Sequence, residues 1–313
     1  MNSKILNSYF LILFSFIPAS IIIGPTISLF NIILIDISFI FFVLSKKDFK
    51  FLSKKTVKLI ILLCLYLIFN SIIAKDFSMS ALRNFGFIRF GILFLAFNYF
   101  FNNIGFINKV LIVWILTLSL LSLDTHIESI LGKNILGYSG NHASRIVSFF
   151  KDEPIVGGYI NGFYLIIIGY LFYLNKDFLN RYKNIILIVS IFFISAIVLT
   201  GERSNTIKAF CGFFLFYSFN DFFKFKEKIF SILLLILTFI ILLNISNFLK
   251  TRFLGQFVQP VIYLFKTDEQ KKNYKIDPYY KDFNNNIYKR LYKSGFEVFK
   301  EYPIFGVGNK NYR

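Results

Sequence analysis

The stretch NIILIVSIFFISAIVLTGERSNTIKAFCGFFLFYSFN fills residues 184–220 and consists of two apolar runs around one short polar turn. Each run approaches the roughly 20 residues that a helix needs to cross the hydrocarbon core of a bilayer. The turn, Gly201-Glu202-Arg203-Ser204, places a carboxylate and a guanidinium where the second run begins. Ionisable groups at membrane depth are costly, so this turn is a candidate functional site.

The same pattern recurs along the whole chain. Of its 313 residues, 56% are hydrophobic, which exceeds the apolar share of about 45–50% in soluble domains. Nine apolar runs predict an all-α, polytopic integral membrane helical bundle with about nine transmembrane helices. The first is interpreted as a retained helix because more runs follow at once, and a re-entrant pair is the alternative for the seventh and eighth. They cover approximately residues 5–23, 26–44, 57–74, 84–101, 107–123, 155–174, 184–200, 204–220 and 229–248.

Charged residues between the runs predict the orientation. The formal net charge of +18 would ordinarily suggest nucleic acid, but the basic residues lie in short loops, so we expect no nucleic-acid partner. If the N-terminus is cytoplasmic, the cytoplasmic short loops carry more than twice as many Lys and Arg residues as the opposite loops. The positive-inside rule therefore predicts a bundle over residues 1–249 with a cytoplasmic N-terminus, and an outer segment over residues 250–313. The 75–83 turn and the 124–154 loop then also face outward.

Cysteine and histidine usage gives no sign of a cofactor. Cys64 and Cys211 lie inside apolar runs, and His126 and His142 lack the spacing of paired metal ligands. We therefore expect no disulfide framework, no metal and no cofactor.

The outer segment contains one predicted amphipathic helix. Between residues 286 and 300, Tyr288, Tyr292, Phe296 and Phe299 recur at helical spacing, with basic residues mostly off that face. Pro303 is expected to stop the helix. The pattern favours a helix at the membrane surface that covers an outer cavity; the alternative is a solvated helix that packs on its own loop.

Arginines are the main candidates for binding an anion. Arg203 begins a helix, where free N–H groups and the helix dipole favour a phosphate, and Ser204 can add a donor. Glu202 either pairs with Arg203 or contacts an acceptor hydroxyl; the alternative is an arginine that snorkels to the interface beside a glutamate. Arg83 and Arg89, six residues apart, do not share a helix face.

A second polar stretch leads into the sixth run. Arg145 and His142 are candidates for phosphate or sugar contacts, while an ordinary polar loop is the alternative. Arg89 is expected to face the bundle interior, where Asp36 is a possible structural partner.

Three stretches together resemble the bacterial O-antigen ligase and O-antigen polymerase family. Residues 200–204, TGERS, resemble its Ser-Arg turn, and residues 145–154, RIVSFFKDEP, resemble its approach to a membrane helix. The most specific element is Arg290, followed by YPIFGVGN at residues 302–309, which is similar to the family's Pro-x-x-Gly-x-Gly segment. The resemblance covers roughly residues 83–313.

This resemblance implies a metal-independent glycosyltransferase of the bacterial inner membrane, with residues 250–313 in the periplasm. Such enzymes move a glycan from undecaprenyl diphosphate to a sugar hydroxyl, which belongs to lipid A–core for a ligase and to a growing polysaccharide for a polymerase. Arg203 and Arg145 would then act as catalytic residues that stabilise the charge on the departing diphosphate. The resemblance adds Arg290 as a third residue for the diphosphate. The other candidate substrate-binding residues, from the patterns above, are Arg83, Arg89, Glu202, Ser204 and His142.

Two departures from the family keep other functions open. Asn205 stands where the family has glycine, and the chain stops at Arg313, before the histidine and the further helices with which family members continue. We therefore expect a truncated chain whose general base lies beyond residue 313. The alternatives are a transporter or flippase of lipid-linked glycans, with Asp36, Arg89 and Lys208 at membrane depth, or an inactive remnant.

Overall fold

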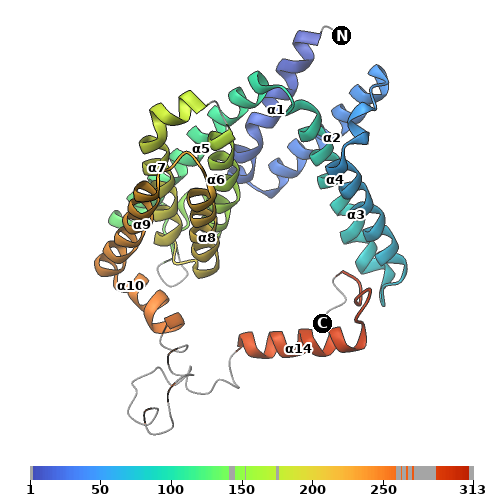
Figure 1. The fold of residues 1–313 in the computed structure, drawn as a ribbon. Coiled ribbons are helices and arrows are strands. Elements are labelled where there is room, and N and C mark those ends of the chain that lie inside the picture. The colour runs from blue at the N-terminus through green and yellow to red at the C-terminus, as the bar shows by residue number, and fades with distance from the viewer. Residues whose placement is uncertain are drawn as a thin grey trace. The chain divides into compact units, whose positions relative to one another are not determined.

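A computed structural model describes residues 3–140, 145–151, 153–173, 176–258, 262, 266, 270 and 287–309. Within these residues every regular element is helical, and each of nine long helices coincides with one predicted apolar run (Figure 1). The nine are α1 (Ser3–Ile23), α2 (Pro25–Lys46), α3 (Lys55–Ile72), α4 (Phe77–Phe100), α5 (Ile104–Leu131), α6 (Val156–Tyr173), α7 (Lys176–Leu199), α8 (Arg203–Phe219) and α9 (Phe225–Ile245). The shorter elements are η1 (Lys50–Ser53), η2 (Ser148–Phe150), α10 (Asn247–Lys250), the π-helical η3 (Thr251–Val258) and α14 (Ile287–Glu301).

Seven of the long helices are long and apolar enough to cross a membrane, namely α1 to α5, α7 and α9. Helix α6 contains a shorter apolar helix, Val156–Leu171, and α8 has 17 residues. The prediction of an all-α, polytopic membrane protein is therefore confirmed. The seventh predicted apolar run, residues 184–200, corresponds to α7. Helix α7 is long and apolar enough to span the membrane.

Two predicted loop boundaries are wrong. Helix α4 begins at Phe77, so Arg83 lies in its second turn and not in a 75–83 turn. Asp76 caps this helix by accepting a hydrogen bond from the N–H of Met79, 3.2 Å away. Helix α5 continues to Leu131, so the outer loop begins after that residue and not at residue 124. Both helices extend past the apolar run because polar side chains at their ends find partners within the protein.

The chain divides into two compact units by its internal contacts. Unit 1 comprises residues 1–110 and 282–313, and unit 2 comprises residues 111–281. This grouping differs from the predicted division at residue 249, which concerns the membrane boundary and stays a prediction. In unit 1, α1, α2 and α4 meet through rings that include Phe10 and Phe100, whose centroids lie 4.3 Å apart.

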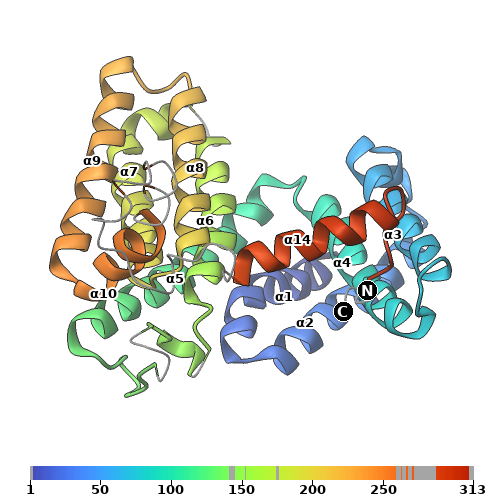
Figure 2. The ribbon, with the colours of Figure 1, turned by 90° about the horizontal axis from the view of Figure 1, so that it is seen from below.

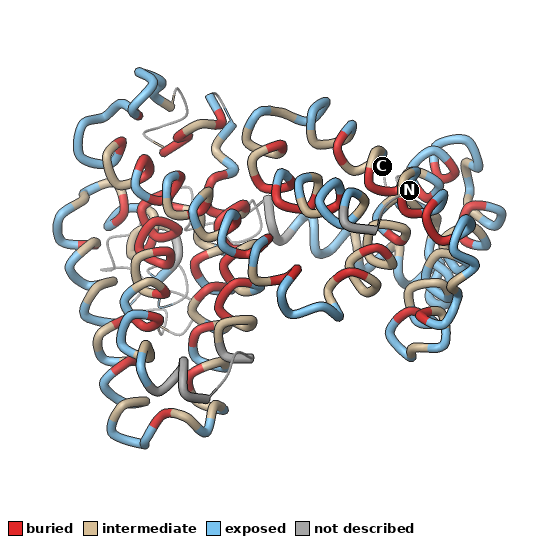
Figure 3. Tube along the Cα trace, turned by 90° about the horizontal axis from the view of Figure 1, so that it is seen from above, coloured by how far each residue is buried: buried red, intermediate tan, exposed pale blue. Residues whose placement is uncertain are grey.

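Helices α6, α7, α8 and α9 form the core of unit 2. Helix α7 packs against each of the other three, and its last seven residues are all buried. Figure 3 shows buried positions along the facing sides of the packed helices and exposed positions along their outer sides. Exposed residues of the long helices include Phe41 and Leu82, at 73% and 80%. Such wide apolar exposure fits helices whose outer faces contact lipid.

Helix α14 confirms the predicted helix in the outer segment. It spans Ile287–Glu301 and ends two residues before Pro303. Tyr292, Phe296 and Phe299 are all exposed, as the amphipathic pattern requires. Beyond this helix, the chain turns back toward the ends of α3 and α4, within unit 1 (Figure 2). Its placement at the membrane surface over a cavity stays a prediction.

Candidate functional site

Two buried carboxylates near the end of α5 anchor the loop that follows this helix. The two carboxylate oxygens of Glu128 accept hydrogen bonds from the N–H groups of Val147 and Ser148, at 3.1 and 2.6 Å. One turn earlier, Asp124 accepts from the N–H of Ile135 at 2.8 Å and from the Ser148 hydroxyl. Buried charges of this kind persist only where donors satisfy them. The two residues therefore hold the backbone next to Arg145 against α5.

The turn between α7 and α8 requires a glycine. Gly201 has a φ of +70°, a conformation that L residues rarely adopt. A Cβ atom at this position would lie 2.8 Å from the ring of Phe248. Gly201 thus allows the turn to touch the segment that follows α9, which contains α10 and η3.

Glu202 binds the start of α6 and not its neighbour Arg203. Its Oε1 atom accepts a hydrogen bond from the N–H of Gly157 at 3.0 Å, and its Oε2 atom accepts from the side chain of Asn205. Gly157 permits this contact, because a Cβ atom there would lie 2.7 Å from Oγ1 of Thr200. A carboxylate at a helix N-terminus is stabilised by the free N–H groups and the helix dipole. Glu202 therefore joins the turn to α6.

Arg203 is half-buried at the start of α8, and its guanidinium donates to a neutral partner. The Nη1 atom lies 2.9 Å from the backbone carbonyl of Gln256 in η3. Nη1 of Arg252 donates to the side-chain oxygen of the same Gln256, also at 2.9 Å. Two guanidinium groups thus converge on one residue of a π-helical segment, a conformation that is frequent at functional sites. Ser204 is exposed on the first turn of α8.

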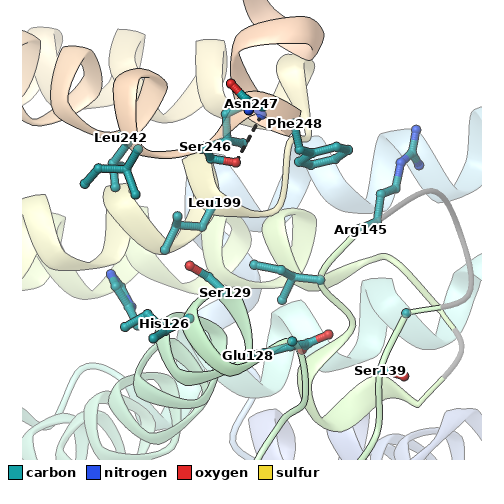
Figure 4. A pocket seen from close by; sticks show the side chains of 16 residues that line it. His126, Glu128, Ser129, Ser139, Arg145, Leu199, Leu242, Ser246, Asn247 and Phe248 are labelled. Carbon is teal, nitrogen blue, oxygen red and sulfur yellow. Dashed lines mark hydrogen bonds between the residues drawn. The ribbon is translucent and has the colours of Figure 1, made fainter.

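A cavity of about 670 Å³ lies beside this turn in unit 2 (Figure 4). Its walls come from the end of α5, the anchored loop, the end of α7 and the segment around α10; they include His126, Glu128, Ser129, Arg145, Leu199 and Phe248. Arg145 is a lining residue, whereas Arg203 is not. Among the described residues, no acidic side chain pairs with Arg145 or with Arg203.

Sequence reasoning missed two residues of this region. Arg252 lies in a stretch without a recognisable motif. His126 was expected in a loop, but it lines the cavity from the last turns of α5. Its Nδ1 atom lies 2.7 Å from the carbonyl of Ser122, its Nε2 atom lies 2.9 Å from the hydroxyl of Ser195, and its ring stacks on Phe192. Because the carbonyl only accepts, Nδ1 carries a hydrogen and donates it to Ser122.

The remaining predicted site residues belong to unit 1 or are not described. Arg83 is exposed on α4, and Arg290 is exposed on α14. Arg89 is half-buried, with its guanidinium 4.9 Å from the centroid of the Phe90 ring. It interacts electrostatically with Asp36, but no ion pair within 4 Å joins these two described residues. His142 lies outside the described residues. The described residues also contain no group of three side chains able to hold a metal ion.

The fold and this site define a multi-pass membrane protein with arginines gathered beside a cavity. A family model described as O-antigen ligase matches residues 188–313. This match supports an O-antigen ligase/polymerase family member with an O-antigen ligase-like function in cell-surface polysaccharide biosynthesis. The match begins within α7, so it includes Arg203 and Arg290 but not Arg145. No curated protein and no solved structure matches the chain at a significant level.

Proposed function

We propose that this protein transfers a glycan from undecaprenyl diphosphate to a sugar hydroxyl on the periplasmic face of the bacterial inner membrane. The N-terminus is then cytoplasmic, and residues 250–313 are periplasmic. The acceptor is lipid A–core or a growing polysaccharide. This function deepens the family's role in polysaccharide biosynthesis by naming a donor, an acceptor and a leaving group.

The observation that carries the proposal is the set of hydrogen-bond partners of Arg203 and Glu202. Glu202, the nearest carboxylate in sequence, accepts hydrogen bonds from Gly157 and Asn205, and among the described residues Arg203 bonds the carbonyl of Gln256 and forms no ion pair. Arg203 therefore presents a guanidinium that no carboxylate pairs with at a helix N-terminus, which favours an anion. A guanidinium matches phosphate oxygens through two parallel hydrogen bonds. Arg145 on the cavity wall adds a second positive charge.

In the proposed reaction, the acceptor oxygen attacks the anomeric carbon of the donor glycan. The bond from that carbon to the diphosphate oxygen breaks, and its electron pair leaves with undecaprenyl diphosphate. The acceptor hydroxyl releases its proton to the medium. Since negative charge builds on the diphosphate, arginines poised beside it lower the barrier.

A transporter of lipid-linked glycans is the second candidate. It is favoured by Asp36 and Arg89, which lie in two spanning helices and each have a buried polar atom without a hydrogen-bond partner. Lys208 is exposed on α8, and its position at membrane depth stays a prediction. Labelling of an Arg89→Cys variant by impermeant thiol reagents from both sides of the membrane would favour transport, and protection from both sides would argue against it.

Arginine variants in cells test the transfer proposal through the length pattern of surface polysaccharide. We expect Arg203→Ala and Arg145→Ala to lose the ladder of glycan lengths, because one lost donor to a developing anion costs roughly 10²–10³ in rate. Lys208→Ala, which removes an exposed cation from the same helix as Arg203, should leave the ladder normal. Normal ladders in both arginine variants, at normal protein levels, would refute the assignment.

A further inference from the structure

We propose that the hairpin of α3 and α4 carries a docking site for the chain's own C-terminal turn (residues 303–309), which holds both on one face of the membrane. The site is an amide cluster made of four polar side chains, Asn70, Ser71, Ser80 and Asn84. Ser71, Ser80 and Asn84 are fully buried, and Asn70 is 7% exposed. Buried polar groups are costly unless they are hydrogen-bonded, so such a cluster needs partners.

Part of the cluster is satisfied within the hairpin. The side-chain nitrogen of Asn84 lies 3.0 Å from the carbonyl of Leu67 and 2.9 Å from the hydroxyl of Ser71. It also lies 3.3 Å from the hydroxyl of Ser80. Asn84 thus ties α4 to the last turns of α3. The oxygen of Asn84 and the amide of Asn70 remain to be paired.

The C-terminal turn supplies the missing partners from more than 220 residues away. Asn70 donates to the carbonyl of Phe305 at 2.9 Å, and the side chain of Asn309 donates to the oxygen of Asn84 at 3.1 Å. The N–H of Asn309 donates to the hydroxyl of Ser80 at 3.1 Å. The ring of Phe305 meets Phe69 edge to face, with centroids 5.5 Å apart.

The glycines of the turn explain how the backbone reaches the cluster. Gly306 and Gly308 have φ values of +69° and +90°, which only glycine adopts without strain. These two residues curl the chain so that carbonyl groups before and between them face the hairpin. The carbonyl of Val307 accepts from the N–H of Lys75, 3.3 Å away in the α3–α4 connection. The Pro-x-x-Gly-x-Gly pattern is therefore a docking element for this hairpin.

The docking constrains the membrane topology. Because the α3–α4 connection and residues 303–309 touch, the chain between them crosses the membrane an even number of times. Four helices in that interval, α4, α5, α7 and α9, are long enough to span. The rest of the interval after α9 has no apolar run near spanning length, since its longest is residues 261–265. Helices α6 and α8 consequently either both cross or both fail to cross.

Packing in unit 2 favours two crossings. Helices α6 and α8 each pack against the spanning α7 and against each other. Their lengths of 18 and 17 residues correspond to about 26–27 Å, close to the hydrocarbon thickness of about 30 Å. The proposal thus places nine crossings in the chain, without reference to the reaction it performs.

Disulfide crosslinking tests the contact in the full chain within native membranes. In a background without the native thiols (Cys64→Ala, Cys211→Ala), we expect Lys75→Cys with Val307→Cys to form a disulfide under mild oxidation. Residues that share a backbone hydrogen bond have Cα atoms within the roughly 4.4–6.8 Å that a disulfide requires. A Lys47→Cys with Val307→Cys pair is the matched control and should not crosslink, because Lys47 caps the C-terminus of α2, before α3 begins. Absence of a crosslink in the first pair would overturn the docking.

An asparagine variant tests the amide cluster itself. We expect Asn84→Leu to lower the yield of the Lys75–Val307 crosslink about tenfold, because the lost hydrogen bonds are collectively worth roughly 1.4 kcal/mol. Asn98→Leu on the same helix, whose amide bonds only the carbonyl of Phe94, should leave the yield unchanged. An unchanged yield in Asn84→Leu would show that the cluster does not hold the turn.

Impermeant maleimide labelling tests the crossing number. Single cysteines at the exposed Met79 and Ile304 should be labelled from the same side. A cysteine at the exposed Ser204, at the start of α8, should be labelled from that side too, because four helices separate it from Met79 when α6 crosses and three when α6 does not. Labelling of Met79→Cys and Ile304→Cys from opposite sides would overturn the proposal, as would labelling of Ser204→Cys from the side opposite to both. None of these measurements requires glycan transfer, so they stand even if the proposed function fails.

Discussion

The α7–α8 turn of unit 2 and the α3–α4 connection of unit 1 play the same structural role with different chemistry. Each holds a segment that follows α9: the first binds η3 through Arg203, and the second binds residues 303–309 through the amide cluster. At the amide cluster, neutral amides and hydroxyls pair with one another and with the turn. At the α7–α8 turn, Glu202 accepts hydrogen bonds from Gly157 and Asn205, and Arg203 has no ion-pair partner among the described residues.

That difference indicates which turn stabilises the fold and which is available for a ligand. A set of mutually satisfied neutral groups gains nothing from binding a further charge. A guanidinium bonded only to a carbonyl keeps its full charge and its remaining donors. We therefore expect variants at the α7–α8 turn to separate activity from stability, and variants at the amide cluster to change stability and topology.

The largest expected effect is on Arg203. Replacement by lysine keeps a positive charge and a donor for Gln256 but loses the planar fork that grips two phosphate oxygens. We expect Arg203→Lys to lower the transfer rate by about tenfold to 100-fold, with unchanged protein level and Tm. The rate is measured in membranes with a lipid-linked glycan donor. A rate equal to that of the unmodified protein would mean that charge alone suffices and would weaken the two-oxygen model of binding.

Glu128→Gln comes next and acts on stability. Glutamine keeps one acceptor oxygen but turns an NH₂ group toward one of the two N–H groups that the carboxylate now satisfies. We expect a loss of about 2 kcal/mol, the cost of a buried donor without a partner, together with faster proteolysis of residues 132–151. Glu153→Gln, in the same loop but exposed, is the control. Equal protease sensitivity of the two variants would contradict the anchoring role of Glu128.

Gly201→Ala tests the close contact of the turn with Phe248. The alanine combines a left-handed backbone with a Cβ atom 2.8 Å from the ring. We expect a cost of about 1–2 kcal/mol, observed as a lower Tm in detergent. Gly162→Ala is the matched control, because this helical glycine of α6 has open space around its Cα atom. There, alanine should leave the Tm unchanged or raise it slightly.

The smallest effect concerns the cap of α4. The N–H of Met79, with the Ser78 hydroxyl, lowers the pKa of Asp76 below its usual value. The cap is therefore fully present at neutral pH and is lost as the pH falls through this lowered pKa. Asp76→Asn, which caps a helix without titrating, should leave the Tm at neutral pH nearly unchanged and reduce its fall toward about pH 3. An identical pH dependence in both proteins would argue against the cap.

The sequence predicted the helices well and their ends poorly. Apolar length alone identifies α1 to α9, because a membrane span must bury nearly every side chain in hydrocarbon. The same criterion ended α5 too early, since Asp124 and Glu128 looked like loop residues. They are accommodated in a helix only because N–H groups of the following loop satisfy them. No local sequence pattern predicts the pairing of these carboxylates with the loop N–H groups.

The candidate site shows the same limit. Arg203 and Arg145 were recognised from their neighbours in sequence, and both lie at or beside one cavity in unit 2. Arg252 and His126 were not recognised. Arg252 matters through its hydrogen bond to Gln256, and His126 matters through its place in the cavity wall. The role of Asn84 could not be predicted from the sequence either, since its partner Asn309 lies 225 residues away.

The amino-acid order alone determined the number and position of the long helices and carries the resemblance to the O-antigen ligase and polymerase family, because membrane spans and short motifs are local properties. The tertiary structure decided which groups the charged side chains bind. Glu202 is adjacent to Arg203 in the chain, but its carboxylate binds Gly157, 45 residues earlier. Hydrogen bonds act over about 3 Å, so their partners are set by which backbones approach one another and not by which residues are neighbours in sequence.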